Sequence, residues 1–291
     1  MRRFKFDWVD AFSTQPFGGN GCAVVHDAAH LDADTCMAFV RETGLVECTF
    51  VGPSETADIH VRYFLASREI PFAGHPTLAT VAALQARGHL SGDEVVFETG
   101  AGRVPVTLTP DGIEMVQVKP VFGAQANPAL VAAAVGLCPE DIVDTPQIVS
   151  TGLPFCITLL RDHDALRRAC LVPDAWAELA RSIGADGLDV MEPFLVTLTG
   201  ASPGGDTFSR LLLAPPSPPE DPFTGSATGA MAAYLWARGH KPHGRFVAEQ
   251  GHWMGRPGRA EVSPVGAADA LTGVRLRGQA YVLMQGDLNL P

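Results

Sequence analysis

Side chains able to carry protons or bind anions stand at two points of the sequence, each just before a stretch of small and apolar residues. His75 follows Gly74 at the first point, and Asp221 lies four residues before Gly225 at the second. If both stretches are helices, their free N–H groups and positive dipole ends attract an anion, and glycine lets it approach the backbone. The pattern indicates a carboxylate site. The alternative is that the glycines serve tight turns, while His75 caps a helix and Asp221 forms a turn.

An internal repeat relates the two points. Residues 69–89 and 220–240 are identical at 12 of 21 positions with a constant offset of 151. His75 aligns with Ser226, and Asp221 aligns with an isoleucine, so the polar residues differ where the scaffold is kept. A single asymmetric site between two homologous halves would produce this divergence.

The elements that must hold these residues predict an α+β chain. Each repeat indicates a buried helix with no polar face, which begins near Pro76 or Ser226 and ends before Gly88 or Gly239. Short segments rich in Val, Ile and Phe between turns are typical of strands: 4–9, 21–25, 48–51, 59–64, 95–98, 104–108, 114–118, 148–150, 156–160, 194–198, 209–213, 246–249, 260–262, 274–276 and 280–284. Amphipathic surface helices are expected over 32–43, 127–135 and 174–183. We expect two halves of about 130–150 residues, each with strands around one central helix.

Composition narrows the class of protein. Of 291 residues, 46% are hydrophobic and 18% are charged, which indicates a globular chain. The net charge of −11 disfavours nucleic acid and anionic membranes as partners. The six cysteines form no C-x-x-C pair, the N-terminus lacks the apolar region of a signal peptide, and no apolar stretch is long enough to cross a bilayer. We expect a cytoplasmic protein with reduced thiols and no metal site.

Six segments resemble the PhzF-like phenazine biosynthesis isomerase family, which has the diaminopimelate epimerase fold. They appear in family order: Val9-Asp10-Ala11-Phe12, Pro16-Phe17-Gly18-Gly19-Asn20, Glu47-Cys48-Thr49-Phe50-Val51, Pro71-Phe72-Ala73-Gly74-His75-Pro76-Thr77, Ser150-Thr151-Gly152-Leu153-Pro154-Phe155 and Glu220-Asp221-Pro222-Phe223-Thr224-Gly225-Ser226-Ala227. The resemblance implies two pseudo-symmetric domains, 1–122 and 123–279, each a mixed, mostly antiparallel sheet rolled around a central helix. It leaves open whether the strand over about 280–291 crosses back to the first domain. It also implies an active site between the domains, a homodimer and no cofactor.

The same motifs carry over the site residues. Glu47 is expected to be the acid/base that moves a proton on the substrate, while His75 and Asp221 position the substrate and assist its ionisation. The residues implied to bind the substrate are Asn20, Gly74, Gly225 and Ser226. The substrate carboxylate is implied to lie at the starts of the two central helices, here called the helix heads.

Glu47 also fits this role on physical grounds. Its neighbours from Leu45 to Val51 are apolar or weakly polar, so its carboxyl group would be partly desolvated. Desolvation raises the pKa of a carboxyl group, which lets it both take and return a proton. Without the resemblance, a glutamate on the exposed end of a strand is the alternative.

The expected function is a cofactor-independent shift of a proton and a double bond on a small unsaturated cyclic carboxylate, in a pathway to a secondary metabolite. The racemase branch of the fold places cysteines at the two helix heads, where this chain has Ala73 and Thr224. An amino-acid epimerase or racemase and a non-catalytic ligand-binding protein are the alternatives. Phenazine precursors and pyrroline carboxylates both remain open as substrates, as does a contribution of Cys22 or Cys48 to the site.

Overall fold

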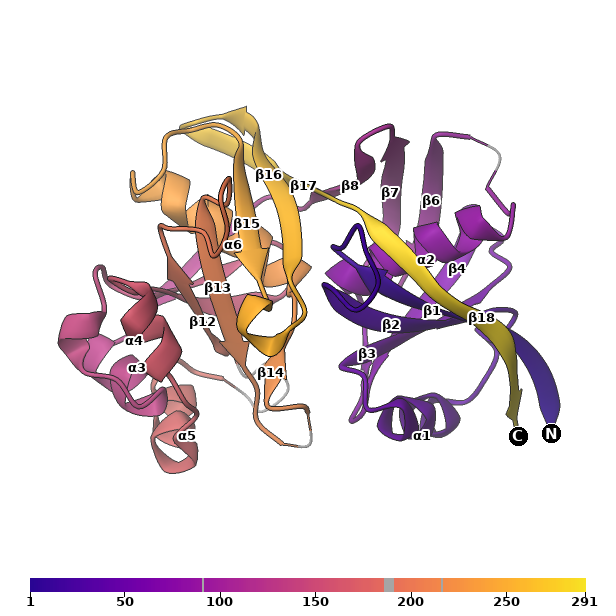
Figure 1. Cartoon of the computed structure of the whole chain (residues 1–291), viewed down its shortest axis with the longest axis horizontal. Helices are drawn as coiled ribbons and strands as arrows, with labels where there is room; N and C mark the ends of the chain where they lie inside the picture. The colour runs from indigo at the N-terminus through magenta and orange to yellow at the C-terminus, as the bar shows by residue number, and fades with distance from the viewer. Residues whose placement is uncertain (91, 186–190, 216) are drawn as a thin grey trace.

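Two halves of similar build lie side by side in the computed structural model (Figure 1), which describes residues 1–90, 92–185, 191–215 and 217–291. Both chain termini lie at the N-terminal half, because the last strand returns to it. The strands of this half are β1 (Arg2–Ala11), β2 (Asn20–Val25), β3 (Glu47–Gly52), β4 (Ile59–Leu65), β5 (Glu69–Ile70), β6 (Glu94–Thr99), β7 (Gly102–Thr109), β8 (Gly112–Gln117) and β18 (Ala280–Leu290).

The strands of the C-terminal half follow the same plan. They are β9 (Val121–Gln125), β10 (Gln147–Ser150), β11 (Pro154–Leu159), β12 (Pro193–Thr197), β13 (Thr207–Leu212), β14 (Glu220–Asp221), β15 (Phe246–Gln250), β16 (Gly258–Ala267) and β17 (Ala270–Gly278).

The order of pairing is the same in both halves. The N-terminal half runs β18-β1-β2-β3-β4-β6-β7-β8, and the C-terminal half runs β9-β10-β11-β12-β13-β15-β16-β17. The pairs β2–β3 and β4–β6 are parallel, as are their counterparts β11–β12 and β13–β15; the other pairs are antiparallel. Antiparallel pairing of β8 with β17 joins the halves. The chain passes from the N-terminal to the C-terminal half between β8 and β9, and it returns between β17 and β18. The expected α+β fold, with mixed and mostly antiparallel sheets, is confirmed.

One apolar helix lies inside each roll of strands. They are α2 (Gly74–Ala86) and α6 (Gly225–Ala237), and nearly every residue of both is buried in a core that the two halves share. Gly88 and Gly239 follow the helix ends with left-handed φ angles of 70° and 71°, as the sequence predicts. The starts differ from the prediction.

The two helices begin before the residues that were expected to start them. Ala73 and Thr224 are the N-cap residues, so Pro76 and Ser226 already lie in the first turn. Neither cap residue makes a side-chain hydrogen bond to the helix start. The starts are fixed instead by the short strands β5 and β14, which hold the preceding segments at β4 and β13.

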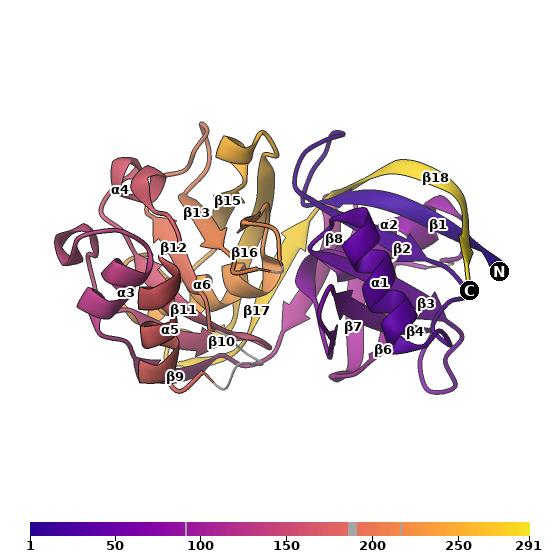
Figure 2. The same cartoon turned by 90° about the horizontal axis from the view of Figure 1, so that it is seen from below.

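The outer faces of the rolls are covered by short helices (Figure 2). Helix α1 (Ala33–Thr43) covers the N-terminal half, and the C-terminal half carries α3 (Pro128–Ala134), α4 (His163–Arg168) and α5 (Pro173–Ser182). The 3-10 turns η1 (Pro139–Asp141) and η2 (His252–Met254) complete the elements. The sequence prediction missed α4 and the strands β5, β9 and β14, and the expected boundary at residue 122 falls inside β9.

Glu69 and Glu220, which are identical in the two repeats, make the same contact with an arginine of the preceding strand in each half. Arg62 forms a two-bonded ion pair with Glu69, and Arg210 forms one with Glu220. Each arginine also donates to two backbone carbonyls of its own half. The conserved scaffold therefore fixes the strand that leads into each central helix, while the residues that differ lie at the helix heads. No helix in the described part of the chain is long and apolar enough to span a bilayer.

Candidate active site

A pocket of about 110 Å³ lies between the halves, beside the starts of α2 and α6. Glu47, Leu65 and Ile70 reach it from the N-terminal half, and Phe155, Asp221 and Ser226 reach it from the C-terminal half. A larger hollow of about 400 Å³ also exists, but it is lined by none of the predicted site residues. The smaller pocket is therefore the candidate site.

Glu47, the first residue of β3, points its carboxyl group into this pocket. Its side chain is 14% exposed, and Oε2 lies 3.5 Å from Nδ1 of His75. Burial and, to a smaller extent, the neighbouring charge of Asp221 together raise the pKa of Glu47 to about 8. A carboxyl group with a pKa near neutrality can donate and accept a proton under the same conditions. The raised pKa expected from the sequence is thus found.

His75, in the first turn of α2, lies buried behind Glu47. Burial lowers its pKa to about 3, the backbone of Gly21 opposes this shift, and the charge of Arg256 adds to it. The ring is therefore neutral near pH 7. Its Nε2 atom is buried without a hydrogen-bond partner among the described residues, while Nδ1 lies 3.2 Å from Nδ2 of Asn20.

Asn20, the first residue of β2, connects the two halves at the site. Its Nδ2 atom donates to Oδ1 of Asp221 at 2.6 Å and to the carbonyl oxygen of Phe223 at 2.9 Å. Since the same atom lies near His75, one amide group aligns both polar residues of the helix heads. Asn20 is not among the residues that line the pocket, and its amide contacts the side chains of His75 and Asp221.

Asp221 is held by a second set of bonds within the C-terminal half. Oγ1 of Thr224 donates to Oδ2 of Asp221, and Nε2 of Gln250 donates to the Asp221 carbonyl at 2.7 Å. Burial raises the pKa of Asp221 to about 6, although the hydrogen bonds from Thr224 and Asn20 oppose this. Asp221 is therefore mostly ionised at pH 7, when Glu47 is mostly protonated. Two carboxyl groups with separated pKa values in one pocket are typical of acid–base sites.

The helix heads meet each other directly. A Cβ atom at Gly74 would lie 3.0 Å from the backbone nitrogen of Ser226 and 3.2 Å from Gly225. A Cβ atom at Gly225 would meet the ring of Phe12 at 3.0 Å. Gly74 is thus closely packed against the start of α6, and Gly225 is closely packed against Phe12; neither glycine lines the pocket. Of the three predicted carboxylate-binding residues, Ser226 alone lines it.

The structure brings Glu47, His75, Asp221 and Asn20 together. It also places Thr224 and Gln250 at Asp221. The sequence carried no signal for Gln250, and for Thr224 it carried only the position at a helix head. Cys22 and Cys48 are buried and do not line the pocket; burial raises the pKa of Cys48 to about 12 and that of Cys22 well above its usual value. Neither thiol is therefore available as a base near pH 7.

Within the described residues, no group of three or more His, Cys, Asp or Glu side chains is arranged to hold a metal ion. The chemistry that the pocket offers is proton transfer between carboxyl groups and a bound molecule.

Replacing Asp221 by asparagine is expected to lower the pKa of Glu47 from about 8, because the variant removes a like charge that raises it. The ionised fraction of Glu47 at pH 7 should rise accordingly. The measurement is a ¹³C-carboxyl NMR titration, with the Glu47 signal assigned by its absence in Glu47→Gln. Asp144→Asn, which removes a carboxylate that does not line the pocket, is the control. A Glu47 pKa that is unchanged in Asp221→Asn would contradict the coupling.

The chain is similar to known proteins over most of its length. The family model for the phenazine biosynthesis-like protein PhzC-PhzF matches residues 9–286. The chain is 31% identical to the trans-2,3-dihydro-3-hydroxyanthranilate isomerase of Pseudomonas aeruginosa over 96% of both chains. It is also 31% identical to the uncharacterized isomerase YfhB of Bacillus subtilis over 87% of this chain and 88% of that protein. A PhzF-family phenazine biosynthesis protein of Bacillus anthracis shares the fold, with a TM-score of 0.86 and 24% identity over 99% of this chain and 100% of that one.

Proposed function

The chain belongs to the phenazine biosynthesis-like PhzC-PhzF family and is an isomerase, and on that premise we propose that it moves a proton and a double bond on a small unsaturated cyclic carboxylate without a cofactor. The observation that carries the proposal is the Glu47 carboxyl group, which has a pKa of about 8 and borders the pocket between the halves. We further propose a homodimer in the cytoplasm, serving the synthesis of a secondary metabolite.

In the proposed step, ionised Glu47 takes a proton from a saturated ring carbon. The electron pair of the broken C–H bond moves into the conjugated system and toward the carboxylate. Protonated Glu47 then returns the proton to another carbon on the same face, so the atoms and charges of substrate and product are equal. With a pKa of about 8, roughly a tenth of Glu47 is ionised at pH 7, and both forms take part in turnover.

Asp221 and His75 support this step in different ways. Ionised Asp221 keeps the Glu47 proton from being lost to solvent, because a second negative charge in the pocket is unfavourable. Neutral His75 lies 3.5 Å from Glu47, so it can share the proton without forming a fixed ion pair. The Nε2 atom of His75 is buried and has no hydrogen-bond partner among the described residues.

The arrangement supports one acid/base better than two. Racemisation with opposed bases needs a second proton-carrying group at the other face, and the helix caps at those positions are Ala73 and Thr224. The carboxyl groups that line the pocket are those of Glu47, Glu192 and Asp221, and Asp221 accepts hydrogen bonds from Asn20 and Thr224. The substrate class follows from the relative in Pseudomonas aeruginosa, whose name gives trans-2,3-dihydro-3-hydroxyanthranilate as its substrate.

Incubation with conjugated cyclic carboxylates in deuterated water tests the proposal, beginning with trans-2,3-dihydro-3-hydroxyanthranilate. We expect a positional isomer, because the double bond moves. Ultraviolet absorption and proton NMR measure its formation. A sample without protein is the control. Deuterium at an inverted stereocentre of an unshifted substrate would show a racemase instead, and a bound but unchanged carboxylate would show a binding protein.

A further inference from the structure

The loop of residues 12–19, which delivers Asn20 to the site, has an unusual backbone. Phe12, Phe17 and Gly19 adopt left-handed φ angles of 62°, 68° and 52°. Such angles are costly for phenylalanine and persist only where surrounding contacts hold them. At Gly19 a Cβ atom would lie 1.9 Å from the carbonyl oxygen of Ala11, so no other residue fits there. Something outside the loop must therefore fix its conformation.

The residues between η2 and the start of β16, in the C-terminal half, make those contacts. The backbone N–H of Gly19 donates to the carbonyl of Pro257 at 3.0 Å, and the N–H of Arg259 donates to the carbonyl of Phe12 at 3.0 Å. These two bonds cross from one half to the other at the two ends of the loop. They tie the loop to a segment that lies far from it in the sequence.

Arg256 adds three side-chain bonds to the same loop. Its Nη2 atom donates to Oδ1 of Asp10 at 2.7 Å and to the carbonyl of Gly18 at 3.0 Å, and its Nε atom donates to the carbonyl of Gly19 at 2.9 Å. Asp10 is fully buried, and its other oxygen accepts from the N–H of Phe17. The planar guanidinium thus holds both residues directly before Asn20, which a point charge could not do.

We propose that Arg256 is a positioning residue of the active site. From the C-terminal half, it fixes the loop that ends at Asn20, and Asn20 in turn aligns His75 and Asp221. Arg256 does not line the pocket, so it acts on the site through Asn20 and through its charge near His75, and not through contact with substrate. The expected effect of Arg256 on turnover rests on the proposed function, whereas its effect on the positions of Asn20 and His75 does not.

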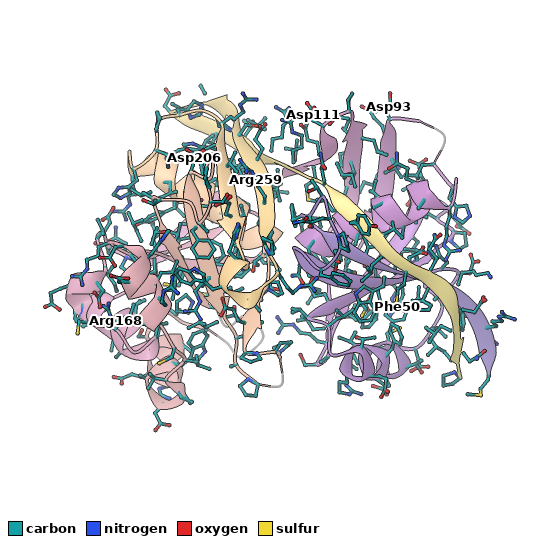
Figure 3. The ribbon with its side chains drawn as sticks, viewed as in Figure 1. Phe50, Asp93, Asp111, Arg168, Asp206 and Arg259 are labelled. Carbon is teal, nitrogen blue, oxygen red and sulfur yellow. The ribbon has the colours of Figure 1, made fainter. Side chains whose placement is uncertain are left out.

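Two variants of Arg256 and one matched control test this. Arg256→Met removes all three bonds, whereas Arg256→Lys keeps a positive charge beside buried Asp10 and cannot reproduce the paired bonds to Gly18 and Gly19. Arg259→Met is the control, because the Arg259 side chain, labelled in Figure 3 on the C-terminal half, donates to Gly204 within its own half. The first readout is ¹⁵N NMR of the Asn20 amide and the His75 ring in selectively labelled protein, which needs no substrate.

We expect the Asn20 and His75 signals to shift in both Arg256 variants and to stay unchanged in Arg259→Met. With a substrate in hand, kcat should fall by about 10- to 100-fold in the Arg256 variants with little change in KM, since displacement of catalytic groups by about 1 Å costs up to about 100-fold. If Arg256→Met does not fold, Arg256→Lys decides the matter. Unchanged Asn20 and His75 signals in a folded Arg256 variant, or equal effects of Arg259→Met, would overturn the proposal. An inactive wild-type protein would contradict the proposed function and leave the NMR result standing.

Discussion

Glu47→Gln is expected to lower turnover by about 10²- to 10⁴-fold, the range that a general acid–base group contributes. Glutamine has nearly the same shape as glutamate and cannot accept or return the proton. Steady-state kinetics with the substrate found in deuterated water measure the loss. KM should change little, because the carboxylate of the substrate is expected to bind at the helix heads and not at Glu47. Activity within twofold of wild type would remove Glu47 from the mechanism.

The stability of the same variant shows whether the protein remains folded and whether Glu47 has the raised pKa. In the folded protein the pKa of Glu47 is about 8, against the ordinary value of 4.5. The folded state therefore holds this proton more tightly than the unfolded state, so Glu47 lowers the stability progressively as pH rises from about 4.5 to about 8. Glutamine does not titrate. Glu47→Gln should thus melt at a higher temperature than wild type at pH 8 and at a similar temperature at pH 4.

The repeat made much of the fold predictable from the sequence. Repeated residues such as Glu69 and Glu220 form equivalent ion pairs in the two halves, so the repeated sequence indicated a repeated set of contacts. The differing residues at the helix heads, His75 and Asp221, contribute to one site, where the Asn20 amide contacts both. Divergence within a repeat was therefore a physical signal: scaffold contacts must be satisfied in each half, whereas one site needs its groups only once.

What the sequence did not predict depends on contacts between distant segments. Arg256 lies more than 230 residues from Gly19, and no local pattern indicates that the two meet. Gln250 likewise contacts Asp221 and Thr224 only because β15 lies beside β13. The close packing at Gly74 could not be predicted for the same reason, since the atoms that a side chain would meet belong to the other helix. Strand β9 was missed because its residues are all exposed and show no alternation of burial.

The last prediction concerns the anion at the helix heads. The chain carries a net charge of −11, so its overall field repels an anion and the attraction must be local. Of the residues at the starts of α2 and α6, Ser226 lines the pocket, so we expect backbone N–H groups in the first turn of α6 to bind the anion there. A carboxylate there would accept charge-assisted hydrogen bonds, each worth about 1.5–3 kcal/mol.

A cyclic carboxylic acid should therefore bind about 10- to 150-fold more tightly than its primary amide, from the same free-energy range. The ligand pair is 3-hydroxyanthranilate, an aromatic analogue that cannot isomerise, and the corresponding amide, compared by calorimetry. Ser226→Ala should weaken binding of the acid only modestly, because the main donors are backbone groups. Gly74→Ala should abolish the preference, since its methyl group would lie 3.0 Å from the Ser226 nitrogen and force the heads apart. Gly244→Ala, where a methyl group meets no atom within 4 Å, is the matched control and should bind like wild type. Equal affinity of the wild-type protein for acid and amide would show that the helix heads do not bind a carboxylate, and the proposed substrate class would then fail even if Glu47 proved essential.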